Sequence, residues 1–250
     1  SGPFGEFVHD VLVLDATYLL VAAKFGKGRH VEVPAEFAER YGPHEVLFVF
    51  REKVRFLLET VQPVRAVAIF DPGLANRKWW QDVFPDAAAG RFGGYKRGGG
   101  KRRRFQEHPN DVVQRLVQDL GAEMLVAPRQ WDADDLIGAT THALDAAAAR
   151  QERQAADRGG VPSSSASSAS FTVAIASADQ DMLQLLTPRV RLVKLLQRVS
   201  TAAPLGLELV TAADVEAKYG LPPARYADLR AIAGKKNDKQ VEGCGTGERL

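Results

Sequence analysis

Aspartates follow three of the short apolar runs in this sequence. The first run ends at Asp15, the second at Asp71, and the third is followed by Asp179 and Asp181. Two carboxylates ~4 Å apart repel each other by roughly 4 kcal/mol at an effective dielectric constant of ~20, and a divalent cation removes this cost. Ligand sets made only of oxygen favour Mg²⁺ or Mn²⁺ over zinc. A single aspartate after a strand is more often a turn residue or helix cap, but three such positions together predict a shared metal site.

A fourth acidic cluster stands at the start of a segment with helical periodicity and contains Asp132, Asp134 and Asp135. Asp132 and Asp135 are three residues apart, so they share one face of that helix. Acidic residues in a first turn also suit the helix dipole, which makes the cluster weak evidence when taken alone. Combined with the strand-end aspartates, it predicts a centre in which two ions ~4 Å apart bind the attacking and leaving oxygens of a phosphodiester.

Basic residues are concentrated in the segment 91–104. It contains seven Lys or Arg, five Gly, two aromatic residues and no acidic residue. Basic side chains neutralise phosphates and aromatic rings stack on bases, so the segment predicts a nucleic-acid contact. A solvated loop is the alternative, and the glycines fit it equally well. The residues expected to contact nucleic acid are Tyr95, Arg97, Lys101, Arg102, Arg103 and Arg104.

Strands and helices must alternate to position these residues. Runs rich in Val, Ile and Leu predict strands at 11–14, 66–70, 124–126, 171–176 and 192–196, and helical periodicity predicts helices over about 44–60, 109–120, 132–150, 212–219 and 222–233. This alternation favours a doubly wound, mostly parallel α/β sheet, in which ligands bind beyond the carboxyl ends of the strands. We therefore expect the aspartates to meet at one edge of the sheet. After residue 196 we expect only helices.

The composition bounds the remaining possibilities. A chain of 250 residues can form one large α/β domain with an appendage, and its net charge of +2 hides strong local segregation. The single cysteine, Cys244, excludes an intramolecular disulfide, and no apolar run approaches the ~20 residues of a membrane span. We interpret Gln151–Ser170 as a serine-rich surface insertion and Ser1–Phe7 as a leader outside the fold.

Several short motifs occur in a definite order over residues 11–250. They are Leu14-Asp15, Phe70-Asp71, Gly94-Tyr95-Lys96, Asp132-Ala-Asp-Asp-Leu, Ser177-Ala-Asp-Gln-Asp-Met-Leu-Gln-Leu-Leu and Lys218-Tyr-Gly-Leu. Each motif is short, but their combination and order are specific. They resemble the flap endonuclease and 5′–3′ exonuclease family, which includes the 5′ nuclease domain of bacterial DNA polymerase I and its stand-alone relatives.

The resemblance implies a PIN-like α/β fold and a phosphodiester hydrolase that cuts 5′ flaps and 5′ ends of branched DNA in replication or repair. We expect a nuclease core over 8–200, with a basic helical arch at about 91–108 and the serine-rich insertion at about 151–170. A duplex-binding helical region, the start of a helix–three-turn–helix motif, follows over 201–250 and stops before the second helix of that motif. We expect a monomer that acts on DNA and does not contact a membrane.

The resemblance also implies roles for individual residues. Asp132 stands where the family usually has Glu and would order water ligands, and Lys96 would stabilise charge on the scissile phosphate. The first metal site would use Asp15, Asp71, Asp134 and Asp135, and the second would use Asp179, Asp181 and Asp238. Mg²⁺ or Mn²⁺ is the expected ion, and family members often also hold K⁺ at a turn.

Two departures from the family pattern affect these expectations. Lys235 stands where the family has a second-site aspartate, so we expect one tight and one weaker divalent ion. The turn Glu242-Gly-Cys-Gly-Thr-Gly replaces Pro-Gly-Val-x-Gly-Ile-Gly, which weakens the case for K⁺. Lys235 also leaves open a branched-DNA binding module with weakened or lost catalysis. A PIN-type ribonuclease is a third hypothesis, against which the basic arch and the helices after residue 219 argue.

Overall fold

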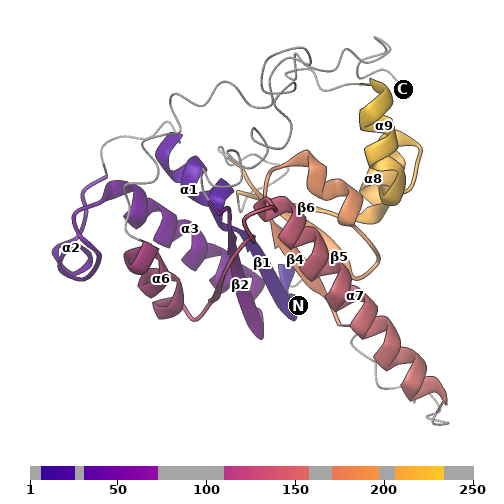
Figure 1. Ribbon diagram of the computed structural model, residues 1–250, viewed down its shortest axis with the longest axis horizontal. Coiled ribbons are helices and arrows are strands. Elements are labelled where there is room, and N and C mark those ends of the chain that lie inside the picture. Colours follow the sequence, from indigo (N-terminus) through magenta and orange to yellow (C-terminus); the bar gives the residue numbers. More distant parts are fainter. Residues whose placement is uncertain (1–6, 26–30, 73–109, 158–170, 197–205, 234–250) are drawn as a thin grey trace.

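The computed structural model describes residues 7–25, 31–72, 110–157, 171–196 and 206–233 (Figure 1). These residues form a six-stranded sheet with the strand order β3-β2-β1-β4-β5-β6. Five neighbouring strands are parallel and β6 is antiparallel to β5. The strands are β1 (Val11–Asp15), β2 (Arg65–Phe70), β3 (Glu123–Val126), β4 (Val173–Ala176), β5 (Val190–Leu195) and β6 (Leu207–Val210). The expected α/β class with a mostly parallel sheet is confirmed.

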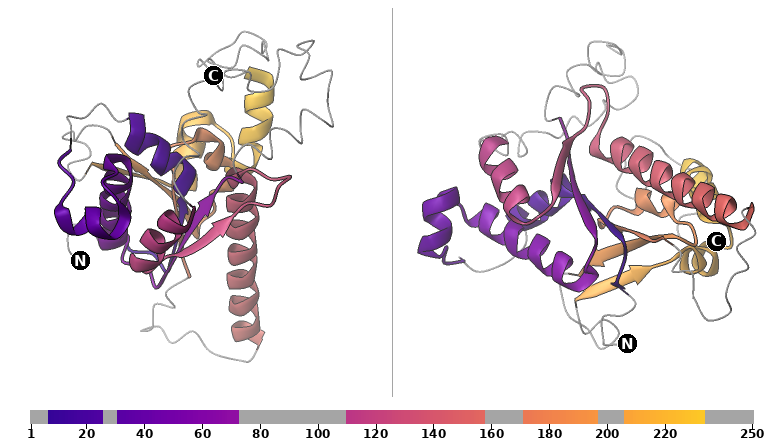
Figure 2. Two further views of the ribbon diagram at one scale, coloured as in Figure 1. Left: turned by 60° about the vertical axis from the view of Figure 1, so that its left-hand side comes forward. Right: turned by 90° about the horizontal axis from the view of Figure 1, so that it is seen from below.

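Helices cover both faces of the sheet (Figures 1 and 2). One face packs against α1 (Ala16–Phe25), α3 (Glu45–Val61) and α6 (Asn110–Asp119), and α2 (Ala35–Tyr41) extends this layer. The other face packs against α7 (Ala133–Asp157), the 3₁₀ turn η3 (Gln180–Leu185), α8 (Ala212–Tyr219) and the pair η4 (Pro223–Arg225) and α9 (Tyr226–Ala233). None of the helices described is both long and apolar enough to cross a membrane.

The central strand β1 shows why the sheet needs cover on both sides. All five of its residues are buried. Leu12 and Leu14 belong to the core under α1 and α3, whereas Val11 and Val13 belong to the core under α7. Each buried side chain of this size contributes roughly 1.5–3 kcal/mol, so strands with apolar residues on both faces are stable only between two helical layers.

Both ends of α8 are set by residues that commonly cap helices. Thr211 caps α8 through a capping box, in which its side chain accepts a hydrogen bond from the Asp214 backbone N–H and Asp214 reciprocates. Gly220 ends the helix with a left-handed backbone at φ 69°. Together these ends fix α8 directly beyond β6, beside η3.

Four local expectations were wrong. Helices α1 and α2 occupy a region expected to be a loop, because α1 is apolar on all sides and carries little helical periodicity. Strand β6 lies where only helix was expected, since four residues are too few to show alternation. Helix α7 continues to Asp157, into the expected insertion, and Arg189 pairs with its Asp145 and Glu152. Phe7, assigned to the leader, is buried in the core.

Candidate metal centre at the carboxyl edge of the sheet

The strand-end aspartates converge as the sequence predicts. Strands β2, β1 and β4 are adjacent and parallel, so their carboxyl ends share one edge of the sheet. Asp15 is the last residue of β1, Asp71 follows β2 directly, and Asp179 lies three residues beyond β4. Three positions far apart in sequence therefore meet at the edge where doubly wound sheets bind ligands.

Asp15 is the buried centre of this group. It is only 4% exposed, and its carboxylate accepts hydrogen bonds from the Tyr18 backbone N–H at 2.9 Å and from the Ser177 hydroxyl at 2.8 Å. Burial raises the pKa of Asp15 from 3.8 to about 6, and the negative charges of Asp71 and Asp179 add to this rise, whereas the two hydrogen bonds lower the pKa. Because burial is the largest cause, the folded chain holds the ionised Asp15 at a cost that a nearby cation would lower.

Asp71 joins the sheet to the start of α7. Its backbone N–H donates to Thr17 Oγ1 at 2.8 Å, and its Oδ1 accepts a hydrogen bond from the Ala133 N–H at 2.7 Å. Helix α7 thus begins directly at the end of β2, and the helix N-terminus faces a carboxylate, the favourable sign for its dipole. This contact brings the second acidic cluster to the same edge.

The acidic cluster at the start of α7 has a capping role. The Asp132 backbone N–H donates to Asp135 Oδ2 at 2.9 Å, so Asp135 partly serves as a helix cap. Asp134 and Asp135 lie in the first turn and are exposed. The capping interpretation therefore accounts for one oxygen of Asp135.

Ser177 connects the two halves of the centre. Its hydroxyl donates to Asp15 and accepts a hydrogen bond from the Asp179 backbone N–H at 3.1 Å. Asp179 in turn caps η3, because its Oδ1 accepts from the Asp181 N–H at 3.0 Å. Sequence reasoning did not assign a role to Ser177 or Thr17. Ser177 begins one of the quoted motifs and stands two residues before Asp179, which is the one signal that could have drawn attention to it.

The donor set of this edge suits a hard divalent cation. It consists of carboxylates, and the raised pKa of Asp15 shows that added positive charge there would be stabilising. In the described ranges, no three His, Cys, Asp or Glu side chains are already spaced to hold an ion. The remaining predicted site residues lie outside the described part of the chain: Tyr95, Lys96, Arg97, Lys101, Arg102, Arg103, Arg104, Lys235 and Asp238.

Comparison with known sequences identifies DNA polymerase I as similar to this chain. The chain is 33% identical to the thermostable DNA polymerase I of Thermus filiformis over 138 residues, which are 55% of this chain and 13% of that protein. It is 24% identical to DNA polymerase I of Lactococcus lactis over 229 residues, which are 91% of this chain and 22% of the relative. The chain thus spans less than a quarter of these relatives. No protein-family model matches it.

Solved structures share the fold. The bacteriophage T5 D15 protein, co-crystallised with metal ions, matches 94% of this chain and 70% of its own with a TM-score of 0.52 at 14% identity. Human GEN1 in complex with Holliday junction DNA matches 96% of this chain and 48% of its own with a TM-score of 0.51 at 13% identity. The chain therefore shares the fold of the T5 D15 protein and of GEN1, and its sequence is similar to part of DNA polymerase I.

Proposed function

We propose that this chain is a metal-dependent, structure-specific 5′ nuclease that hydrolyses phosphodiesters in DNA with a 5′ flap or a branched 5′ end. The observation that carries the proposal is the meeting of Asp15, Asp71 and Asp179 at the carboxyl ends of three adjacent parallel strands, with Asp15 buried among them. The similarity to DNA polymerase I and the shared fold support the same class. DNA is accordingly the proposed partner.

Asp15, Asp71, Asp134 and Asp135 would hold the primary Mg²⁺ or Mn²⁺, and Asp179, Asp181 and Asp238 a weaker second ion. A bound divalent ion supplies a Lewis acid and lowers the pKa of a bound water to generate the nucleophile. The protein's own contribution is positioning. Ser177 and the Tyr18 N–H orient Asp15, and Thr17 and the Ala133 N–H orient the Asp71 segment.

The proposal assigns the remaining sequence-predicted residues to substrate contact. Lys96 would stabilise charge developing on the phosphate, since an ammonium near a phosphoryl oxygen is a general electrostatic catalyst. Asp132 would order water at the primary ion. Tyr95, Arg97, Lys101, Arg102, Arg103 and Arg104 would contact the single strand.

The decisive experiment replaces Asp71 with asparagine. Asp71→Asn keeps the carbonyl oxygen that accepts from the Ala133 N–H, so α7 should stay in place while one negative charge is lost. We expect cleavage of a 5′-flap substrate in Mg²⁺ to fall by at least ~100-fold, with flap binding in Ca²⁺ largely retained. Single-turnover rates and equilibrium binding measure the two quantities.

Asp157→Asn is the matched control, because Asp157 ends α7 far from this edge (Figure 1) and is exposed. Its cleavage rate should equal that of the unmutated protein. Wild-type cleavage by Asp71→Asn would contradict the proposed centre. Tight flap binding without any cleavage by the unmutated protein in Mg²⁺ or Mn²⁺ would instead indicate a binding module.

A further inference from the structure

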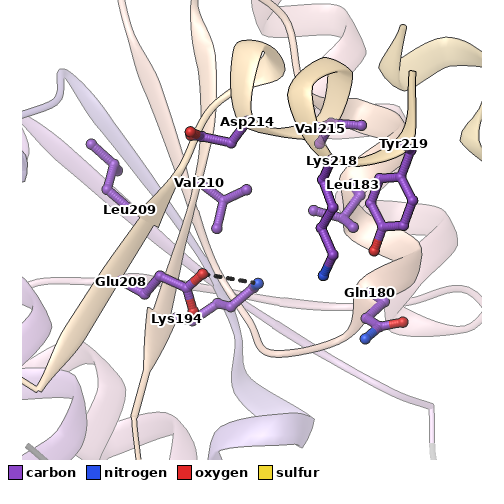
Figure 3. Close-up of a pocket in the computed structure, with 10 residues that line it drawn as sticks. All are labelled: Gln180, Leu183, Lys194, Glu208, Leu209, Val210, Asp214, Val215, Lys218 and Tyr219. Atoms are coloured by element: carbon purple, nitrogen blue, oxygen red, sulfur yellow. Dashed lines mark ion pairs between the residues drawn. The ribbon is translucent and has the colours of Figure 1, made fainter. Parts of the chain in front are cut away.

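A second feature of the same edge lies beyond the carboxylates, where β5 and β6 meet α8. It is an open pocket of about 190 Å³ (Figure 3). A single water needs only roughly 10–15 Å³ of such volume, so the pocket accommodates a larger group. The residues that line it are Gln180, Leu183, Lys194, Glu208, Leu209, Val210, Asp214, Val215, Lys218 and Tyr219.

Two lysines dominate the charge of this pocket. Figure 3 shows the Lys194 and Lys218 ammonium groups pointing into it from β5 and from α8. Glu208 lies 3.7 Å from Lys194 Nζ and is half exposed, which makes a loose ion pair. Lys218 Nζ lies 5.1 Å from the centre of the Tyr219 ring, and among the residues described no carboxylate is within 4.0 Å of it.

Asp214, the other acid of the pocket, is committed elsewhere. Its Oδ2 accepts hydrogen bonds from the Thr211 N–H at 2.8 Å and the Thr211 hydroxyl at 2.6 Å. These bonds lower the pKa of Asp214 and direct its carboxylate to the helix cap. The pocket thus holds two ammonium groups and two carboxylates, but the Asp214 carboxylate is directed to the helix cap and only that of Glu208 pairs, loosely, with a lysine of the pocket.

The sheet register places this pocket beside the metal centre. Leu14, Ala176 and Val193 pair across β1, β4 and β5, so the next residues along, Asp15, Ser177 and Lys194, stand level on neighbouring strands. Side chains alternate along strands, so these three share the face covered by α7 and η3. Neighbouring strands are ~4.8 Å apart, which puts the Lys194 position roughly 10 Å from the Asp15 position.

We propose that this pocket, here called the lysine pocket (Lys194 and Lys218), binds one backbone phosphate of the DNA strand at the metal centre. The inference rests on the proposed function. A phosphodiester strand lying along an edge rich in carboxylates meets repulsion wherever no ion is held, and the ammonium groups of Lys194 on β5 and Lys218 on α8 offset it. Gln180 lines the pocket and stands between Asp179 and Asp181 in the sequence, so the two sites are neighbours along the chain as well.

The test measures the salt dependence of 5′-flap DNA binding by the full chain in Ca²⁺. Lys218→Met keeps the apolar stem and removes one charge, and we expect the slope of log Kobs against log salt to fall by about 0.7–0.9. Lys218→Arg should restore the slope. Arg153→Met is the control for net charge, since Arg153 is exposed on the distal part of α7 (Figure 1), and its slope should be unchanged.

Two further measurements separate a phosphate site from a structural ion pair. Glu208→Gln should tighten binding severalfold, because it frees Lys194 from its ion pair and removes one of the two carboxylates of the pocket. The second measurement replaces single DNA phosphates by uncharged methylphosphonates. At one position near the cleaved bond, this replacement should weaken DNA binding by the unmutated protein and leave DNA binding by Lys218→Met unchanged.

The outcomes distinguish this inference from the proposed function. Flap cleavage by the unmutated protein, together with an unchanged slope in Lys218→Met or no coupling to any single phosphate, overturns the lysine pocket and leaves the nuclease proposal standing. Failure of the unmutated protein to bind or cut the DNA overturns both. A slope change shared equally by Arg153→Met also overturns the pocket, because it would show a diffuse charge effect.

Discussion

Removing the charge of Asp15 should stabilise the metal-free protein. The pKa of this 4%-exposed carboxyl is about 6 in the folded chain against 3.8 ordinarily, so ionisation at neutral pH opposes folding. A shift of about two units corresponds to roughly 3 kcal/mol. Asp15→Asn removes this cost but exchanges the carboxylate oxygen that faces Ser177 for an amide group, a loss of about 1 kcal/mol. The expected net gain is about 2 kcal/mol at pH 7.5.

The sign of the pH dependence follows from the raised pKa. The folded state holds its proton more tightly than the unfolded chain, so the cost is fully present above pH ~6 and disappears as the pH falls towards 3.8. Urea unfolding in EDTA should therefore show Asp15→Asn about 2 kcal/mol more stable than the unmutated protein at pH 7.5. The two free energies of unfolding should converge as the pH is lowered towards 4.5.

Divalent ions should make the unmutated protein more stable than Asp15→Asn. Mn²⁺ or Mg²⁺ binds the folded site and stabilises the unmutated protein by mass action, whereas Asp15→Asn lacks the central ligand and should gain little. Asp157→Asn, at the exposed end of α7, should remain within ~0.5 kcal/mol of the unmutated protein in all conditions. A less stable Asp15→Asn at pH 7.5 in EDTA, with a difference that does not vary with pH, would refute the conclusion that the buried, ionised Asp15 opposes folding.

Three other predictions concern groups away from Asp15. Burial lowers the pKa of His9, which is 2% exposed, so the folded chain keeps its full stability above pH 6.5 and loses part of it as the pH falls and the imidazole takes up a proton. In the Asp15→Asn background, His9→Gln should flatten the decline in unfolding free energy between pH 7 and 5. An equal decline in both proteins would show that His9 does not titrate there. Replacing Arg102–Arg104 by alanine should weaken flap binding and lower its log–log salt slope by up to ~2–3, and an unchanged slope would make this run a solvated loop. Lys235→Asp should strengthen the second ion and raise cleavage at low Mg²⁺, and calorimetry that finds two equally tight Mn²⁺ sites in the unmutated protein would contradict the premise.

The sequence by itself determined the class of fold and the place of the carboxylates. Buried apolar runs such as Val11–Leu14 must pair in a sheet, and parallel strands must put their carboxyl ends on one edge, so Asp15 and Asp71 had to approach each other. The Thr211 cap of α8 was likewise predictable, because it depends on contacts three residues apart. These features rest on periodicity and on local hydrogen bonding, which a sequence carries directly.

Other features were decided only by tertiary packing. Helix α1 lacks a distinct apolar face because both its sides meet other elements, and β6 is a strand because β5 offers it an open edge. Sequence spacing does not reveal that Ser177 bridges Asp15 and Asp179, or that Lys194 stands level with Asp15 two strands away. The pKa of Asp15 is also a tertiary property, since it depends on the water excluded by helices from distant parts of the chain. The sequence therefore supplies the charged groups, and the register of the folded sheet sets which of them act together.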